Sequence, residues 1–196
     1  CAHPLSHRYM ETACAKRSLV VLAADIGIID DLVDMVDLVG PHIAGLKTHV
    51  DMTEGFTMED WGKVIEAAKR HDLMLFEDRK FADIGRVTET QMAGMYDIRS
   101  WADLVTSHSV SGPDIVDGIA SAWDSVQRIG GVLLLAQMSS RGNLLDGSYT
   151  DRTMEIGTAS PHVIGYIGNG SNPSEIKALR EKSGDGKLIW TPGVNL

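Results

Sequence analysis

The stretch "LMLFEDRKFADIG", residues 73–85, begins with apolar side chains and ends in a dense group of charges. Such a run is typical of a strand in a parallel sheet that is covered on both faces and carries its polar residues at the carboxyl end. Asp78 and Lys80 lie two positions apart, so on a regular strand both side chains point to the same face. Asp83 falls beyond the strand end, and strand alternation does not place it on that face.

Similar apolar runs recur along the whole chain. Together with residues 73–80, they predict strands over 19–25, 43–49, 104–109, 131–139, 163–168 and 188–194. Several intervening segments have helical periodicity or helix-end signals, namely 30–40, 57–70 and 172–184, and the gaps 85–99, 113–126 and 150–160 can each hold a helix. Thr57, with Asp60 after it, resembles a capping box, and Ser174 is the predicted cap of the last helix.

Strands that alternate with helices predict βαβ units in an α/β fold. The spacing fits a single TIM (β/α)8 barrel over residues 1–196 better than an open sheet. About seven βα units are visible, and the sequence ends at the seventh strand, below the roughly 250 residues typical of this fold. We therefore expect the eighth strand to be missing from this sequence, because an unclosed barrel would expose two long edges.

Composition excludes some classes of protein. The net charge of -9 and the pI near 5.1 argue against nucleic-acid binding. No apolar stretch approaches the roughly 20 residues that a membrane-spanning helix needs. Cys1 and Cys14 are too few for a disulfide framework, so a reducing, cytoplasmic location is the simplest interpretation. The first residue is not Met, so we expect the start of the chain to be trimmed.

In a barrel enzyme the active site gathers at the carboxyl ends of the strands. The polar residues at these ends are Asp25, Lys47, His49, Asp78, Lys80, His108, Ser139 and Thr191. Lysines and carboxylates alternating at about 4 Å interact by roughly 4 kcal/mol per pair at an effective dielectric near 20, which keeps Lys80 protonated. A lysine held in this way is a suitable proton donor to a developing carbanion and needs no metal.

Other interpretations of these residues stay open at this point. Taken alone, the charges after residue 76 also fit a solvated strand edge or a structural ion pair, and His49 and His108 fit structural roles. The histidines form no HExxH motif or ligand cluster, so no metal site is predicted. The segment "GNGSNP" (168–173) lacks the spacing and the acidic partner of a dinucleotide fingerprint.

Five motifs occur in order: "LKTHVD" (46–51), "FEDRKFADIG" (76–85), "WADL" (101–104), "GSYT" (147–150) and "TPGV" (191–194). Together they resemble the orotidine 5'-phosphate decarboxylase family, especially its eukaryotic-type branch, from about residue 18 to 196. The resemblance implies a cofactor-free TIM barrel that converts orotidine 5'-phosphate to UMP and carbon dioxide in pyrimidine biosynthesis. It also implies a homodimer with active sites shared across the interface.

The resemblance also implies roles for individual residues. Lys80 matches the proton donor to pyrimidine C6, and Asp78 the group beside the departing carboxylate. Lys47 and Asp25 match residues that hold the ribose hydroxyls and complete the charge network. Asp83 matches the carboxylate that reaches into the neighbouring subunit's site. The remaining substrate-binding residues implied by these motifs are Thr48, His49, Ile84, Pro192 and Ser139, the last of which reads the pyrimidine edge.

Some features depart from the family pattern. In the family, a glutamine-containing loop and an arginine that bind the substrate phosphate follow the seventh strand. Neither is in this sequence. We therefore expect these 196 residues alone to decarboxylate orotidine 5'-phosphate very poorly. Gln137 stands where Glu is usual. Val87 stands at a usual threonine, with Thr88 one place out of register, which weakens the expected contact across the dimer.

Two other functions remain as alternatives. One is a magnesium-dependent sugar-phosphate decarboxylase or aldolase relative with the same Asp-x-Lys-x-x-Asp pattern, which sensitivity to EDTA would reveal. The other is a catalytically silent nucleotide-binding or scaffold protein. The full-length gene would show an eighth strand or a fused orotate phosphoribosyltransferase, either of which would support the decarboxylase.

Overall fold

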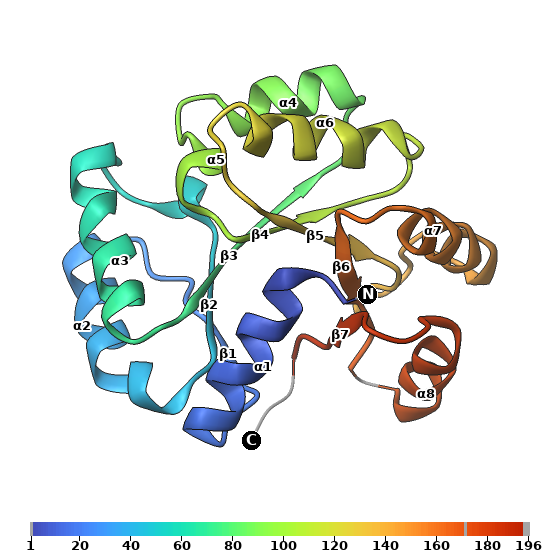
Figure 1. The fold of residues 1–196 in the computed structure, drawn as a ribbon, viewed down its shortest axis with the longest axis horizontal. Coiled ribbons are helices and arrows are strands. Elements are labelled where there is room, and N and C mark those ends of the chain that lie inside the picture. The colour runs from blue at the N-terminus through green and yellow to red at the C-terminus, as the bar shows by residue number, and fades with distance from the viewer. Residues whose placement is uncertain (1, 171, 194–196) are drawn as a thin grey trace.

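The computed structural model describes residues 2–170 and 172–193. Its seven strands form one parallel sheet in which each strand pairs with the next along the chain. The strands are β1 (Val21–Ala23), β2 (Gly45–Thr48), β3 (Met74–Phe81), β4 (Leu104–Ser107), β5 (Gly131–Leu135), β6 (Val163–Ile167) and β7 (Leu188–Trp190). The sheet curls, and β1 and β7 are its two edges (Figure 1).

All seven predicted strands are confirmed, although most are shorter than the apolar runs that predicted them. The last predicted strand, 188–194, is extended only through Trp190, and its residue 194 lies outside the described residues. The predicted α/β class is also confirmed. Its observed form is a curled half-barrel of seven strands.

Helices follow the strands and cover the outer face of the sheet (Figure 1). They are α2 (Ile29–Val39), α3 (Met58–Arg70), α4 (Gly85–Met92), α5 (Ile98–Trp101), α6 (Asp114–Asp124), α7 (Gly147–Ala159) and α8 (Pro173–Lys182). Short 3-10 turns occupy Gly40–His42 and Val50–Met52. Each segment predicted to hold a helix contains one. Within the described ranges, no helix has the length and hydropathy to cross a bilayer.

Local capping explains where two of these helices begin. The Thr57 hydroxyl accepts a hydrogen bond from the backbone N–H of Asp60 at 3.1 Å, so the predicted cap of α3 is confirmed. The prediction for α8 was wrong. The cap is Asn172, whose side-chain oxygen accepts from the N–H of Ser174, and Ser174 lies inside the helix. Proline after Asn172 suits the first helical position, where no N–H partner is needed.

The apolar runs are nearly continuous because the strands bury both faces. Along β3, Met74 and Phe76 point to an inner cluster with Leu133 of β5, whereas Leu75 packs outward with the helices. Glu77 points outward, like Leu75, and Asp78 points inward, like Phe76. The change from apolar to charged side chains therefore occurs on both faces of β3 near its carboxyl end.

A helix that the sequence did not predict, α1 (Pro4–Lys16), packs against the inner cluster through Leu5, Tyr9 and Ala13. Polar side chains of α1 donate hydrogen bonds to backbone carbonyls that lie just before β1 and β2. The Tyr9 hydroxyl donates to Leu19 O at 2.7 Å, and the Lys16 ammonium donates to Ile43 O at 2.9 Å. Helix α1 therefore covers the amino ends of the strands and leaves their carboxyl ends for a site.

Candidate active site

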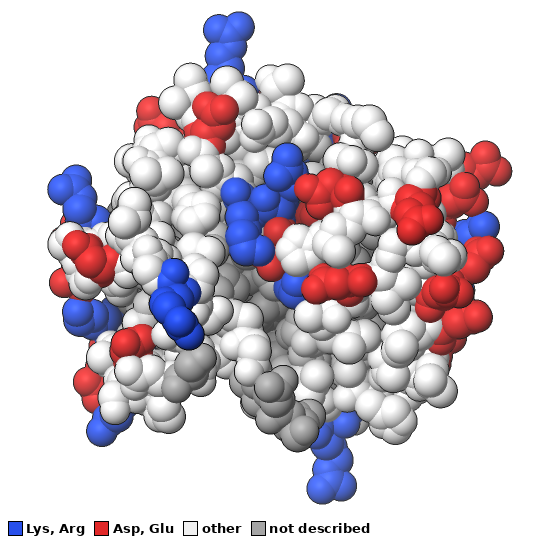
Figure 2. Space-filling model, turned by 180° about the vertical axis from the view of Figure 1, so that it is seen from behind, with Lys and Arg blue, Asp and Glu red and all other residues white. Residues whose placement is uncertain are grey.

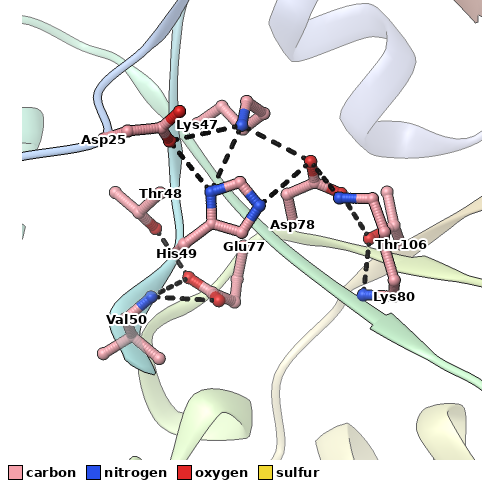
Figure 3. A network of polar contacts seen from close by, with 9 residues as sticks. All are labelled: Asp25, Lys47, Thr48, His49, Val50, Glu77, Asp78, Lys80 and Thr106. Atoms are coloured by element: carbon pink, nitrogen blue, oxygen red, sulfur yellow. Dashed lines mark hydrogen bonds and ion pairs between the residues drawn. The ribbon is translucent and has the colours of Figure 1, made fainter. Parts of the chain in front are cut away.

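Four charged side chains of alternating sign form a continuous array at the carboxyl ends of β1, β2 and β3 (Figure 3). Lys80 Nζ lies 2.7 Å from Asp78 Oδ2, and the same oxygen lies 3.4 Å from Lys47 Nζ. Lys47 Nζ in turn lies 3.6 Å from Asp25 Oδ1. The order is therefore Lys80, Asp78, Lys47, Asp25, with each charge next to one of opposite sign.

His49, just after β2, links the two carboxylates of the array. Its Nδ1 lies 2.9 Å from Asp25 Oδ1 and its Nε2 lies 3.4 Å from Asp78 Oδ2. The same Nδ1 is 3.4 Å from Lys47 Nζ. The imidazole thus holds the outer and inner carboxylates at a fixed separation, which limits how far the array can relax.

Partial burial gives the array its electrostatic character. Burial alone raises the pKa of Asp78, but the hydrogen bond and charge of Lys80, with help from Thr106 and Lys47, outweigh it and hold that pKa below its usual value. Burial also raises the pKa of Asp25, but His49 and Lys47 lower it by more, so that the net shift of this pKa is downward. Both carboxylates are therefore ionised at neutral pH.

Lys80 reaches Asp78 in a different way from the one that strand alternation predicts. The pairing of β3 with β4 shifts between Glu77 and Phe81, so residues 78–80 lie opposite Thr106 alone. Lys80 also has a φ of 52°, in the left-handed region. Such a backbone costs a residue with a side chain about 1–3 kcal/mol, and strained residues of this kind cluster at functional sites. The bulge, not a regular strand, directs the ammonium to the carboxylate.

A second polar layer lies behind the array. Glu77 is fully buried, and its Oε2 accepts from the Thr48 hydroxyl at 2.7 Å, while its Oε1 accepts from Val50 N at 3.2 Å. Burial raises the pKa of Glu77 to about 8, against the opposing effect of these two donors. Glu77 ties the end of β2 to β3. The Thr48 hydroxyl, predicted to bind substrate, donates to Glu77 in this structure.

Asp83 and Ile84 lie beside the array but outside it. Both are exposed, and both line a cavity of about 410 Å³ together with Lys80 and Ser111. The Asp83 carboxylate accepts from Ile84 N at 2.8 Å, and the Ser111 hydroxyl donates to Asp83 O at 2.9 Å. The loop is therefore fixed at its backbone, with the Asp83 side chain at the surface next to Lys80.

The predicted residues of the later strands lie outside the network of Figure 3. Ser139 is exposed in the segment after β5, and Pro192 is exposed after β7. Neither belongs to the network in Figure 3. His108 follows β4, and its pKa is lowered by burial and by the positive charge of Lys80. The structure thus joins the predicted residues at the ends of β1 to β3 in one network, which does not include Ser139 or Pro192.

Charged side chains of both signs meet on one face of the molecule. The face opposite the view of Figure 1 has Lys and Arg side chains gathered near its middle, directly beside Asp and Glu side chains (Figure 2). Across residues 2–170 and 172–193, no three His, Cys, Asp or Glu side chains are grouped in a way that could hold a metal ion. The arrangement suits charge stabilisation and proton transfer.

Sequence reasoning missed two side chains of the network, those of Glu77 and Thr106, and the backbone N–H of Val50. Glu77 could have been found as the acidic residue on the face of its strand opposite Asp78. Thr106 stands two residues before His108, so alternation would have placed both on the same face as the array.

Comparison with known proteins gives the family of the chain. The family model described as "Orotidine 5'-phosphate decarboxylase / HUMPS family" matches residues 18–196. The orotidine 5'-phosphate decarboxylase of Torulaspora delbrueckii is 38% identical over 197 residues, which cover 98% of this chain and 72% of the relative. That of Pichia kudriavzevii is 38% identical over 199 residues, with 98% and 73% covered.

A solved structure supports the fold. The crystal structure of orotidine 5'-phosphate decarboxylase from Pyrococcus horikoshii OT3 superposes with a TM-score of 0.74 at 22% identity and covers 91% of this chain and 80% of the other. At this identity the likeness speaks for the fold alone. The family match over nearly the whole chain and the identity to the two yeast relatives go further, and the chain belongs to the orotidine 5'-phosphate decarboxylase / HUMPS family.

Proposed function

We propose that this protein is a carbon-carbon lyase that decarboxylates orotidine 5'-phosphate to UMP in pyrimidine biosynthesis. One observation carries the proposal: the Lys80 ammonium is fixed 2.7 Å from the Asp78 carboxylate, inside an array that continues through Lys47 to Asp25. Family membership and the names of the relatives support the choice of substrate.

The chemistry follows from this array. The bond between pyrimidine C6 and the substrate carboxylate breaks, carbon dioxide leaves, and the electron pair stays on C6. Lys80 donates a proton from its ammonium to C6 and regains one from solvent. Because the ammonium is already in place, it stabilises the developing negative charge without reorganisation in the transition state.

The other members of the array set up this step. Asp78 holds the Lys80 ammonium in place through their 2.7 Å contact. We propose that the substrate carboxylate lies beside Asp78, next to a negative group. Lys47 and Asp25 are proposed to bind the ribose hydroxyls, with His49 holding Asp25 and Asp78 apart. Substrate contacts by Thr48, Ile84, Ser139 and Pro192 remain predictions from the family motifs.

We further propose that the sheet belongs to one TIM-barrel domain closed by an eighth strand between β7 and β1. These two strands are the edges of the curled sheet, and exposed strand edges invite unwanted pairing. We propose a homodimer in which Asp83 enters the partner's site. The exposure of Asp83 beside the cavity that Lys80 lines supports this role. The cytoplasmic location and a linked orotate phosphoribosyltransferase remain predictions.

Lys80→Ala tests the reaction. We expect it to lower kcat by about 10³-fold or more, because both proton transfer and charge stabilisation are lost. The measurement is the absorbance change on conversion of orotidine 5'-phosphate, using protein expressed from the complete gene. Lys69→Ala is the control, because Lys69 is an exposed lysine on α3 that pairs only with Glu66 among the ion pairs of the described residues.

Retained turnover in Lys80→Ala would refute the role of Lys80. Absence of turnover in the unaltered protein would refute the function. The same assay with EDTA separates the magnesium-dependent alternative, since the proposed reaction uses no metal and should keep its full rate.

A further inference from the structure

Thr106 occupies the only β4 position opposite the bulge of β3. Residues Glu77 and Phe81 pair with Val105 and Ser107, so the whole of 78–80 faces this one threonine. Thr106 is fully buried. Its side chain, directed at the bulge, is therefore the group of β4 that meets Asp78 and Lys80 (Figure 3).

The Thr106 hydroxyl uses both of its hydrogen-bonding functions there. It accepts from the backbone N–H of Lys80 at 2.9 Å and donates to Asp78 Oδ1 at 2.8 Å. A hydroxyl carries one proton, so accepting from Lys80 directs that proton to Asp78. The other oxygen of Asp78, Oδ2, holds the Lys80 ammonium at 2.7 Å.

These contacts close a ring. Asp78 binds the head group of Lys80 directly and binds its backbone through Thr106. The bulge takes the Lys80 N–H out of the regular strand ladder, and the left-handed φ of 52° needs support from its surroundings. One hydroxyl supplies a partner for that N–H and also fixes the rotation of the Asp78 carboxylate.

We propose that Thr106 is a positioning residue for the decarboxylation, and that its hydroxyl sets the geometry between the Lys80 ammonium and the Asp78 carboxylate. This inference rests on the proposed function. Thr106 acts through Lys80 and Asp78, so its loss changes the chemical step more than the binding of the substrate's ribose and phosphate.

Thr106→Val tests the proposal, because valine keeps the shape and removes the hydroxyl. We expect kcat to fall by about 10- to 100-fold, the effect of a small misplacement of reacting groups, while KM changes by less than about threefold. Thr106→Ser keeps the hydroxyl, and its kcat should stay within about threefold of the unaltered protein. The protein is expressed from the complete gene and assayed with orotidine 5'-phosphate.

Thr12→Val is the matched control. Thr12 lies on α1, is buried, and donates its hydroxyl to an aspartate, Asp72 Oδ2, at the same 2.8 Å, but at the amino ends of the strands. The Thr12→Val substitution should lower Tm without changing kcat. If Thr106→Val does not fold, Thr106→Ala replaces it, with the same loss of kcat expected.

The outcomes are distinct. A Thr106→Val or Thr106→Ala protein with unaltered kcat, or a Thr106→Ser protein as slow as these, would overturn the positioning role. A rise in KM alone would also overturn it. Absence of turnover in the unaltered protein would instead count against the proposed function itself.

Discussion

Glu77 is the residue whose protonation most affects the folded state near the site. Its pKa is raised from 4.5 to about 8 by burial behind Thr48 and Val50. The folded protein therefore holds a proton that the unfolded chain releases near its ordinary value. The resulting stabilisation is complete below pH 4.5 and is lost as the pH rises to about 8.

Glu77→Gln should remove this pH dependence. A glutamine can accept from Val50 N with its oxygen and donate to the Thr48 hydroxyl with its amide, and it never has to lose a proton. The rise in pKa from 4.5 to about 8 corresponds to about 5 kcal/mol. We therefore expect Tm at pH 9 to exceed that of the unaltered protein by about 10–20 °C, the shift that this free energy produces in a domain of 150–250 residues. At pH 4.5 the two should be similar.

Thermal unfolding followed by circular dichroism at both pH values measures this. Glu66→Gln is the control, since Glu66 on α3 is 63% exposed and pairs with Lys69 at the surface. A Glu77→Gln protein whose Tm falls at pH 9 as steeply as that of the unaltered protein would show that Glu77 is not protonated in the folded state.

For individual residues, the sequence predicted which charged side chains meet. It did not predict the backbone geometry and the hydrogen bonds that hold them together. Strand alternation paired Asp78 with Lys80, but it could not foresee a bulge, because the extra residues are defined only by pairing with β4. Alternation places Thr106 on the face of the array, but the two hydrogen bonds of its hydroxyl depend on the bulge and could not be foreseen. A threonine in an apolar run indicates only a buried strand until its partner strand is known.

Among the helices, α4 and α6 approach each other closely because both carry glycine at the contact. A Cβ on Gly118 of α6 would overlap the carbonyl of Gly85, the first residue of α4. The residues just before Gly85 form the loop that holds Asp83. The packing of the two helices, side by side in Figure 1, therefore sets the position of that loop.

Gly118→Ala should lower the free energy of unfolding by about 1–3 kcal/mol, since the overlap exceeds the gain in helix propensity. Gly62→Ala is the matched variant. Gly62 also lies in a helix, α3, but a Cβ there meets nothing within 4 Å, so we expect a gain of about 0.5–1 kcal/mol. Urea unfolding measures both. Equal effects of the two substitutions would contradict the close contact.

The elements were largely predictable because short, nearly continuous apolar runs alternate with longer segments that have a helical period or can hold a helix. Helix α1 was the exception. Its buried stripe of Leu5, Tyr9 and Ala13 is interrupted by Ser6 and Thr12, which are also buried. This helix is docked partly by polar contacts to backbone, such as that of Lys16, and the polar residues on its buried face weaken the hydrophobic period.

At the scale of the whole molecule, shared sites predict complementation between inactive variants. Lys80→Ala and Asp83→Asn homodimers each lack one group in both sites. Mixing the two, by unfolding and refolding together, should restore about a quarter of the unaltered activity, because half of the dimers are hybrids and each hybrid has one intact site. The measurement is turnover of orotidine 5'-phosphate by the mixture.

Lys80→Ala mixed with Lys47→Ala is the control for this experiment. Lys47 and Lys80 contact the same Asp78 within one chain, so no hybrid of these two variants has an intact site. Restored activity in the control, or none in the Asp83→Asn mixture, would contradict a site completed by Asp83 of the partner subunit.

The strand order has a consequence for how the chain is made. Each strand pairs with the one synthesised just before it, so sheet contacts can form one βα unit at a time as the chain leaves the ribosome. Helix α1 is the reverse case: it precedes all seven strands in the chain, yet Tyr9 packs against Trp190 of β7, with ring centroids 5.2 Å apart. Helix α1 therefore completes its contacts with the sheet only after the seventh strand has emerged.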